Sequence, residues 1–250
     1  MITLDNLTVS YRQHPALHHV NAQLARGSLT AVVGPNGSGK STLLKSIMGL
    51  QPATGGRITV AASRERIAYL PQLTEIDRSF PIDVQDCVLL GCWPLQGAWG
   101  GAGATGLARV ASALQAVGLE GFGQRPIGSL SSGQLQRMLF ARLLVQDAEV
   151  ILLDEPFNAM DSKTTSTLLA LIQRWHQQQR TVVAVLHDDA QVRAQFPQTL
   201  LLARELVACG PTAQVMTEVN LRRARAMAEA WDEAAEVCGT DHPLAPQAAA

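Results

Sequence analysis

The chain has few charged, aromatic and cysteine residues for its length. Of its 250 residues, 16% are charged, 4% are aromatic and four are cysteines. These cysteines form no CxxC pair and lack the spacing to histidine that a zinc site requires, so the pattern indicates neither a disulfide framework nor a structural metal centre. We therefore expect the chain to reside in a reducing compartment.

An excess of charge and a long apolar run are also missing. Twenty Lys and Arg residues face 21 Asp and Glu residues, a formal net charge of −1, so there is no basic field for nucleic acid, and we expect no nucleic-acid partner. No stretch approaches the roughly 18 consecutive apolar residues of a membrane span, and the first residues do not resemble a secretory signal. We expect a cytoplasmic chain. The mean hydropathy of +0.08 favours a partner that covers some apolar surface.

The apolar residues present, 47% of the chain, suffice for a large core and recur in two alternating patterns. Short apolar runs predict strands at 2–9, 28–33, 58–60, 67–70, 150–153 and 181–186, and a closing hairpin at 200–203 and 206–209. Helical spacing predicts helices at 40–49, 82–90, 107–117, 131–145 and 163–178, and a stripe of Leu221, Ala224, Ala228 and Trp231. The alternation predicts an α/β fold with a buried parallel sheet and a helical insertion, in which Gly97–Gly106 is a flexible loop.

The strongest motif lies between a predicted strand and a predicted helix. It matches GxxxxGK[ST] and consists of Gly34, Pro35, Asn36, Gly37, Ser38, Gly39, Lys40, Ser41 and Thr42. Glycines let backbone N–H groups surround phosphate oxygens, and the start of the helix adds partial positive charge. We expect Lys40 to reach the β and γ phosphates of ATP and Ser41 to bind Mg²⁺.

Two adjacent carboxylates end the apolar run at 150–153. Asp154, at the carboxyl end of a parallel strand, is placed to hold Mg²⁺ beside the phosphate loop. Glu155 follows it and precedes Pro156, where an extended backbone can aim it at an attacking water as a general base. Together with the glycine-rich motif, these residues predict a P-loop nucleotide hydrolase, a class that includes motors, recombinases, switches and transporters.

A third motif narrows that class. The sequence Leu130-Ser131-Ser132-Gly133-Gln134 opens a predicted helix and resembles the LSGGQ signature of ABC-type ATPases, with Ser132 where the family usually has glycine. The resemblance extends from about Ile2 to about Thr217. It implies an α/β P-loop ABC-type ATPase core with N-terminal antiparallel strands and an inserted helical subdomain. The expected domain limits are 1–215 for the ATPase domain, about 75–146 for the insertion, and 216–250 for a C-terminal helix and disordered tail.

The resemblance also implies roles for single residues. Tyr11 would stack on adenine, and Gln72 of the Q-loop would contact Mg²⁺ or the attacking water while moving with the insertion. Asp161 matches the D-loop aspartate, and His187 matches the switch histidine that hydrogen-bonds the γ-phosphate. The expected catalytic residues are thus Lys40, Gln72, Glu155 and His187, and the expected Mg²⁺ ligands are Ser41, Gln72 and Asp154.

One phosphate loop and one signature make the chain an incomplete enzyme in this family, because the signature completes the ATP site of the other subunit. The resemblance therefore implies a head-to-tail homodimer with two ATP molecules, each also contacted by Ser131, Gly133 and Gln134, with Asp161 nearby. Ser132 adds a side chain to this site. Either the backbone there needs no positive φ or hydrolysis is slowed, and we expect reduced rather than abolished activity.

The absence of long heptad arms, a second nucleotide domain and fused membrane spans is typical of ATPase subunits from prokaryotic importers. This resemblance implies an integral membrane permease as partner, a periplasmic or extracellular substrate-binding protein acting indirectly, and a peripheral location on the inner face of the membrane. The segment from Asp77 to Gly91 is similar to that of zinc and manganese importers, which favours divalent metal, zinc before manganese. Three alternatives stay open: an importer of iron chelates or cobalamin, a soluble ABC-type ATPase in cofactor assembly, and a slow ATP-dependent dimerisation switch.

Two groups of potential metal ligands fall outside these motifs. His14, His18 and His19 lie near the first strands, and Cys238, Asp241 and His242 lie near the end of the chain. Exposed loop histidines and a frayed tail account for both groups more simply than metal sensing does. We therefore expect no metal site besides that for Mg²⁺.

Overall fold

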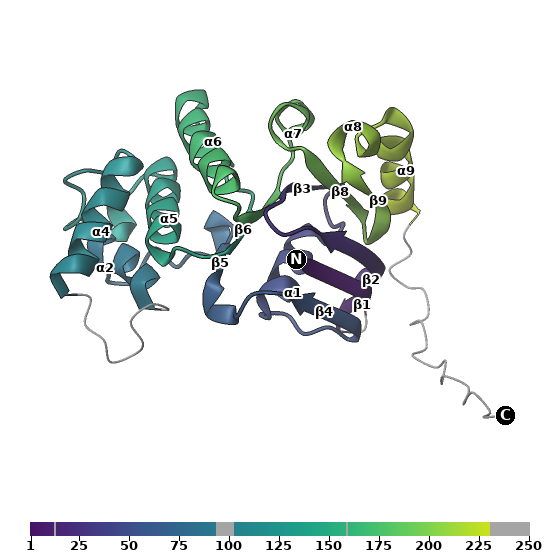
Figure 1. Ribbon diagram of the computed structural model, residues 1–250, viewed down its shortest axis with the longest axis horizontal. Coiled ribbons are helices and arrows are strands. Elements are labelled where there is room, and N and C mark those ends of the chain that lie inside the picture. Colours follow the sequence, from purple (N-terminus) through teal and green to yellow (C-terminus); the bar gives the residue numbers. More distant parts are fainter. Residues whose placement is uncertain (13, 94–102, 159, 231–250) are drawn as a thin grey trace.

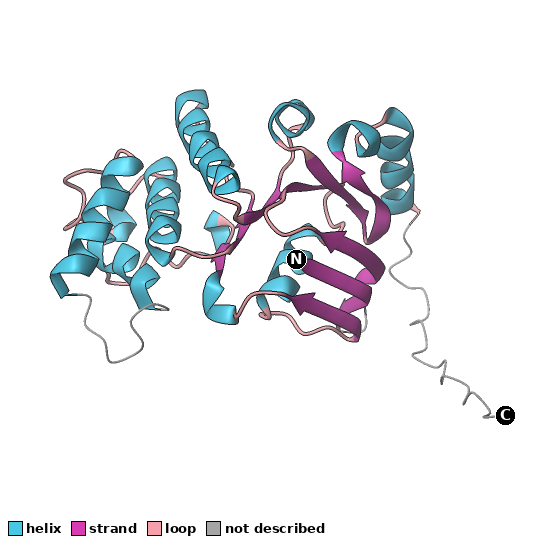
Figure 2. Ribbon diagram, viewed as in Figure 1, coloured by secondary structure: helices cyan, strands magenta, loops and turns pink. Residues whose placement is uncertain are grey.

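The computed structural model describes residues 1–12, 14–93, 103–158 and 160–230. The molecule is built on two sheets, and most of its helices lie at the left and along the top of the view (Figure 1, Figure 2). The antiparallel sheet has the order β2-β1-β4, and the larger sheet has the order β5-β6-β7-β3-β8-β9. The strands are β1 (Ile2–Tyr11), β2 (His14–Leu24), β3 (Leu29–Val33), β4 (Gly55–Val60), β5 (Ile67–Leu70), β6 (Val150–Asp154), β7 (Thr181–Val185), β8 (Gln198–Ala203) and β9 (Glu205–Pro211).

Strands β5, β6, β7, β3 and β8 run parallel, and β9 returns antiparallel to β8 as the expected hairpin. The helices are α1 (Lys40–Met48), α2 (Val84–Leu89), α4 (Gly103–Ala116), α5 (Ser132–Gln146), α6 (Ser162–Gln177), α7 (Asp189–Gln195), α8 (Thr212–Val215) and α9 (Glu218–Glu229). Short 3-10 turns lie at Arg64–Arg66, Leu73–Glu75, Leu90–Cys92 and Ile127–Ser129. The predicted α/β class with antiparallel N-terminal strands is confirmed. None of the described helices is long and apolar enough to span a bilayer.

The larger sheet is buried on both faces, which explains its continuous apolar strands. Successive residues of a strand point to opposite faces, so Ala31 and Val33 of β3 join one core cluster while Val32 joins the other. The first cluster includes residues of α2, α4, α5 and α6, and the second joins α1 and the antiparallel sheet. Helices α2, α4 and α5 group at one end of the molecule (Figure 1), as expected for a helical insertion.

Several elements differ from the sequence-based expectation. Strand β2 was not predicted, and it contains His14, His18 and His19, so these histidines do not lie in a loop. Helix α4 begins at Gly103, so the last four residues of the expected Gly97–Gly106 loop are helical. The remainder of that loop lies outside the described residues, as do Trp231, Cys238, Asp241 and His242.

Candidate active site

Four loops that follow parallel strands meet at one edge of the large sheet. The glycine-rich loop follows β3, Gln72 follows β5, Asp154 ends β6 with Glu155 directly after it, and His187 follows β7. Ligands of open α/β sheets bind outside the carboxyl ends of the strands. The predicted phosphate, metal and base residues are therefore brought together at the edge where such a fold positions a ligand.

The glycine-rich loop depends on glycine at both ends. Gly34 has φ 150° and Gly39 has φ 91°, values that favour glycine. A Cβ at Gly34 would lie 2.0 Å from the Leu202 carbonyl oxygen, and one at Gly39 would lie 2.3 Å from the Ala16 carbonyl oxygen. The loop thus fits closely between neighbouring backbones and leads directly into α1, whose N-terminus favours anions.

Two polar side chains of the loop are suited to an anionic ligand. The Lys40 ammonium donates to the carbonyl oxygens of Gly34 (2.9 Å) and Pro35 (2.7 Å). Burial lowers the pKa of Lys40, and the nearby negative charges of Glu155 and Asp154 oppose that shift. The buried Ser38 hydroxyl has no hydrogen-bond partner among the described residues. A phosphate group would supply acceptors for both donors.

Ser41 and Asp154 form an oxygen-rich pair below the loop. The Ser41 hydroxyl donates to Oδ1 of Asp154 (3.0 Å) and accepts from Nε2 of Gln72 (3.1 Å). Tyr69, in β5, donates its hydroxyl to the other Asp154 oxygen at 3.4 Å. Asp154 is fully buried; burial raises its pKa, while the hydrogen bond from Ser41 acts in the opposite direction.

The oxygen atoms of Ser41 and Asp154 are suitable ligands for Mg²⁺, which takes hard oxygen ligands and usually keeps water and phosphate oxygens in its shell. Within the described residues, no group of three or more His, Cys, Asp and Glu side chains is arranged to hold a metal ion. Ser41 and Asp154 supply two of the oxygen ligands, and water and phosphate oxygens would complete the shell.

Glu155 is held from both sides by polar side chains. Its Oε1 accepts from Nε2 of Gln72 (3.0 Å) and lies 2.9 Å from Nε2 of His187, and its Oε2 accepts from Nδ2 of Asn158 (3.2 Å). Its φ of 50° is rare for a residue with a side chain. The carboxylate is thus fixed in orientation by amide and imidazole groups, an arrangement suited to accepting a proton from a bound water.

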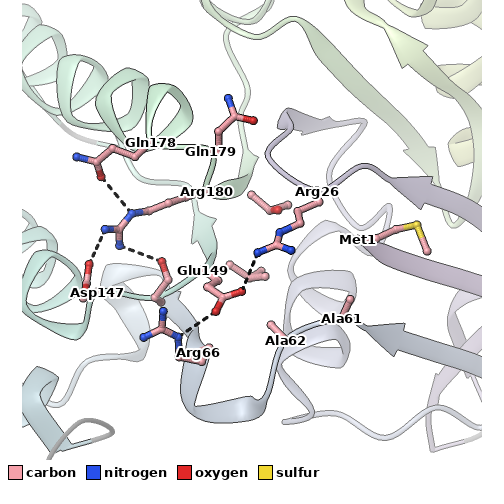
Figure 3. A pocket seen from close by; sticks show the side chains of 13 residues that line it. Met1, Arg26, Ala61, Ala62, Arg66, Asp147, Glu149, Gln178, Gln179 and Arg180 are labelled. Carbon is pink, nitrogen blue, oxygen red and sulfur yellow. Dashed lines mark hydrogen bonds and ion pairs between the residues drawn. The ribbon is translucent and has the colours of Figure 1, made fainter.

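A cavity of about 480 Å³ lies next to Glu155. Its lining includes Asn36 of the glycine-rich loop, Asn158, His187 and Gln191. A hollow of similar size, about 510 Å³, lies at the opposite edge of the sheet (Figure 3). There the lining side chains are paired with one another, as Arg66 is with Glu149 and Arg180 with Asp147.

The signature residues form the N-terminal cap of α5. The Ser131 hydroxyl accepts from the Gln134 backbone N–H (3.2 Å), and the Gln134 side chain accepts from the Ser131 N–H (2.9 Å), a capping box. Ser132 is the first helical residue, so a side chain there requires no positive φ, and Gly133 faces open space. The substitution of serine for glycine at 132 therefore brings no backbone strain.

Three predicted ATP contacts lie apart from this cluster within the single chain. Asp161 caps α6 and accepts from the backbone N–H of Thr164 at 2.9 Å. Tyr11 ends β1 and is 43% exposed, and Ser131 is also exposed. Among the described residues, none of the three is bonded to the groups around Asp154 and Glu155, so their predicted roles require a ligand or a second subunit.

Tyr69 and Asn158 were missed by sequence reasoning. Each carries a detectable signal: Tyr69 lies on the strand leading into Gln72, and Asn158 lies three residues after Glu155, within reach of one turn. A polar side chain near a predicted catalytic carboxylate is too common for position alone to select it.

Comparisons with known proteins agree with this geometry. The family model described as ABC transporter matches residues 17–158. The manganese transport system ATP-binding protein MntB of Listeria monocytogenes is 43% identical over 224 residues, covering 88% of this chain and 93% of the relative. The zinc transport system ATP-binding protein TroB of Treponema pallidum is 39% identical over 228 residues, covering 89% and 86%.

Two solved structures support the same assignment. An inward-facing metal-chelate type ABC transporter matches with a TM-score of 0.78 and 31% identity, covering 90% of this chain and 88% of that chain. A dimeric ATP-binding cassette in a post-hydrolysis state with ADP and Pi matches with a TM-score of 0.76 and 27% identity, covering 85% and 99%. The chain therefore belongs to the ABC transporter family, as one of its ATP-binding, ATP-hydrolysing subunits.

Proposed function

We propose that this chain is the ATPase subunit of an importer of divalent metal, either manganese or zinc, and that it couples ATP-driven dimer closure to movement of a separate permease. One observation carries the catalytic part of the proposal. Glu155, beside a phosphate loop, is oriented by Gln72, His187 and Asn158. The names of the manganese and zinc relatives support the cargo.

ATP binding begins at the glycine-rich loop. The phosphates would replace the loop carbonyls as partners of Lys40 and would accept from the Ser38 hydroxyl. Backbone N–H groups of the loop and of the start of α1 surround the remaining phosphate oxygens. The residues that hold the nucleotide are Gly34, Pro35, Asn36, Gly37, Ser38, Gly39, Lys40, Ser41 and Thr42, with Tyr11 against the adenine.

Ser41, Gln72 and Asp154 would hold Mg²⁺. When bound, it supplies positive charge that balances the phosphate oxygens. Asp154 remains close to Ser41 through its position at the end of β6, and the Tyr69 hydroxyl orients its second oxygen. Gln72 contacts both Ser41 and Glu155, so it joins the metal side of the site to the base.

Hydrolysis proceeds by attack of a water on the γ-phosphorus, which breaks the bond from that phosphorus to the β,γ-bridging oxygen and releases ADP as the leaving group. Glu155 orients this water and accepts its proton as the bond to phosphorus forms. His187 holds the Glu155 carboxylate at 2.9 Å and hydrogen-bonds the γ-phosphate once ATP is present. Lys40 stabilises the negative charge that spreads over the phosphate oxygens in the transition state.

The second half of each ATP site comes from a second copy of the chain. Ser131, Gly133 and Gln134 stand at the start of α5, and Asp161 stands at the start of α6, with Ser131 and Asp161 exposed. A helix start offers N–H groups to the γ-phosphate of the partner. The dimeric state of the solved cassette with ADP and Pi supports the presence of a second copy.

The permease partner is proposed to bind the helical subdomain, about 75–146, within the 1–215 ATPase domain; residues 216–250 form the C-terminal extension. Phe80, Leu90 and Trp93 are large apolar residues that are 59%, 41% and 57% exposed near α2. Large apolar side chains exposed on one short segment of chain favour an interaction surface there. The chain would then lie peripherally on the inner face of the membrane, with a substrate-binding protein acting on the far side.

The proposal is tested by cellular metal content. Zinc, manganese, iron and cobalt are measured in a strain lacking this protein, grown under metal limitation, and in strains complemented with wild type or Lys40→Ala. We expect a selective fall in manganese or zinc that wild type restores and Lys40→Ala does not. A selective fall in iron or cobalt would assign that metal as the cargo instead. Unchanged contents of all four metals would overturn metal import.

A further inference from the structure

One buried amide connects the signature helix to the catalytic loop. Gln136 lies in α5 and is 1% exposed, and its Nε2 donates to the Pro156 carbonyl oxygen at 2.9 Å. Pro156 is buried and directly follows Glu155. The bond therefore joins two segments that are 20 residues apart in sequence and that belong to different halves of the proposed ATP site.

Each end of this connection is rigid. At one end, Gln136 stands five residues beyond the helix cap at Ser131, roughly 7.5 Å along the axis at the rise of an α-helix. At the other end, Glu155 has a φ of 50°, and its carbonyl oxygen accepts from the Asn158 N–H at 3.3 Å. A residue in this conformation persists only where its surroundings hold it. The bond to Pro156 holds the chain at the position immediately after it.

The Gln136 side chain is only half satisfied. Its Oε1 is buried and has no hydrogen-bond partner among the described residues. A buried acceptor without a partner destabilises the folded state, so packing alone favours an apolar side chain here. The hydrogen bond to the Pro156 carbonyl is therefore the feature that distinguishes this amide from an apolar side chain of similar size.

We infer that Gln136 is a positioning residue: through Pro156, it transmits the orientation of α5 to the Glu155 carboxylate. When Ser131 binds the γ-phosphate of the partner's ATP, α5 is fixed, and the Pro156 carbonyl is fixed with it. Glu155 then has the backbone position from which it can reach the attacking water. This inference rests on the proposed function, because it assigns Glu155 as the base and Ser131 as the contact to the partner's ATP.

The test compares two glutamines of the same helix. Gln146, at the far end of α5, also donates its Nε2 to a backbone carbonyl, that of Ile67, at 3.1 Å, but it lies at the other edge of the sheet. Gln136→Met and Gln146→Met each remove one such donor with little change in volume. For the full-length protein, kcat and KM for ATP and the unfolding midpoint are measured for both variants.

We expect Gln136→Met to lower kcat by about 10- to 100-fold, the scale of a misplacement near 1 Å, while KM changes little. Gln146→Met should leave kcat unchanged at a similar unfolding midpoint. Equal kcat for Gln136→Met and wild type, or an equal loss in Gln146→Met, overturns the inference. If Gln136→Met does not fold, Gln136→Glu, which replaces the donor by an acceptor, is measured against Gln146→Glu by the same criteria.

A double-mutant cycle separates positioning from general damage. In a Glu155→Gln background the carboxylate that Gln136 positions is gone, so Gln136→Met should lower the residual kcat by less than about twofold. A full further loss in that background contradicts the inference. Failure of the proposed function gives a different result, because Glu155→Gln alone would then hydrolyse ATP as fast as wild type.

Discussion

The two ends of the parallel strands hold carboxylates in opposite electrostatic settings. At the carboxyl ends, Asp154 and Glu155 accept from hydroxyl, amide and imidazole groups. At the amino ends, Glu149 lies between Arg66 (3.2 Å) and Arg26 (3.7 Å), each measured from guanidinium nitrogen to carboxylate oxygen (Figure 3). The same sheet thus carries acids held by hydroxyl, amide and imidazole groups at one end of its strands and acids paired with guanidinium at the other.

The partners of the carboxylates distinguish the proposed catalytic edge from the structural edge, whereas the volumes of the two cavities do not. The hollows at the two edges measure about 480 and 510 Å³. A guanidinium cancels the charge of a carboxylate, whereas hydroxyl, amide and imidazole donors orient it and leave its charge available to a cation or a water proton. The carboxyl edge therefore has the available carboxylate charge that its proposed catalytic role requires, whereas the amino edge joins the loops that precede the strands.

The largest difference between the two edges is expected when one carboxylate at each edge is replaced by its amide. Glu155→Gln removes the proton acceptor, and we expect single-turnover ATP hydrolysis to slow by about 10²- to 10⁴-fold, the contribution typical of a general base. Glu149→Gln makes the same chemical change at the amino edge and should leave the rate unchanged. Hydrolysis by Glu155→Gln at the wild-type rate would refute the assignment of the base.

The cations of α1 offer the next contrast. Lys40 faces the phosphate loop, whereas Lys45, one turn later, pairs with Glu75 at 2.8 Å. Lys40→Ala removes charged hydrogen bonds to phosphate and should weaken ATP binding by about 10- to 100-fold, the range expected for such bonds. Nucleotide titration by calorimetry measures this effect.

Lys45→Ala serves as the control for that titration, since it removes a charge of the same helix outside the loop. Its ATP affinity should remain close to wild type. An unchanged affinity in Lys40→Ala, or equal losses in both variants, would contradict the placement of the phosphates at Lys40.

The phosphate loop and the carboxylates of the carboxyl edge were predictable from local sequence patterns, whereas Gln72 and His187 were expected only from the resemblance to ABC-type ATPases. The glycine-rich motif and the apolar run ending in Asp154 follow from spacing alone, and the parallel strands then place them together. The capping box at Ser131 and Gln134 likewise lies within one turn. The roles of Tyr11, Ser131 and Asp161 stay predictions, because each needs a nucleotide or a second subunit.

The elements that escaped prediction depend on distant contacts. Strand β2 contains three histidines and a proline, so its apolar alternation is broken, and it is held by its pairing with β1 along Ile2–Tyr11. The bond from Gln136 to Pro156 joins segments that only the packed core brings together. The Glu149 pairs at the amino edge also connect separate loops. Contacts between segments that are distant in sequence cannot be predicted from the spacing of residues.

At the amino edge, stability rather than turnover should respond to substitution. Glu149→Gln weakens two ion pairs whose side chains are partly exposed, with Glu149 and Arg66 each 41% exposed. Pairs of this kind stabilise a fold by up to about 1 kcal/mol, and salt screens them. We expect a loss of that size in the free energy of unfolding, measured by urea denaturation, and a smaller loss in 1 M salt than in 0.1 M salt.

The exposed Glu120 provides the matched control for this measurement. Glu120→Gln should change neither the free energy of unfolding nor its dependence on salt. If Glu149→Gln instead slows hydrolysis while leaving stability intact, the functional contrast between the two edges does not hold.

The smallest effect is expected at Ser132, where the signature departs from its family. Ser132 begins α5 with helical geometry and no positive φ, so glycine offers no relief of strain there. Ser132→Gly should lower the free energy of unfolding by about 0.5 kcal/mol, the difference in helix propensity between the two residues. It should also raise the steady-state hydrolysis rate, because it removes a side chain from the signature that is proposed to contact the partner's ATP. A matched substitution at the other end of the helix, Gln146→Gly, should destabilise the protein without raising the rate. Equal rates for Ser132→Gly and wild type would show that this serine is neutral in the signature.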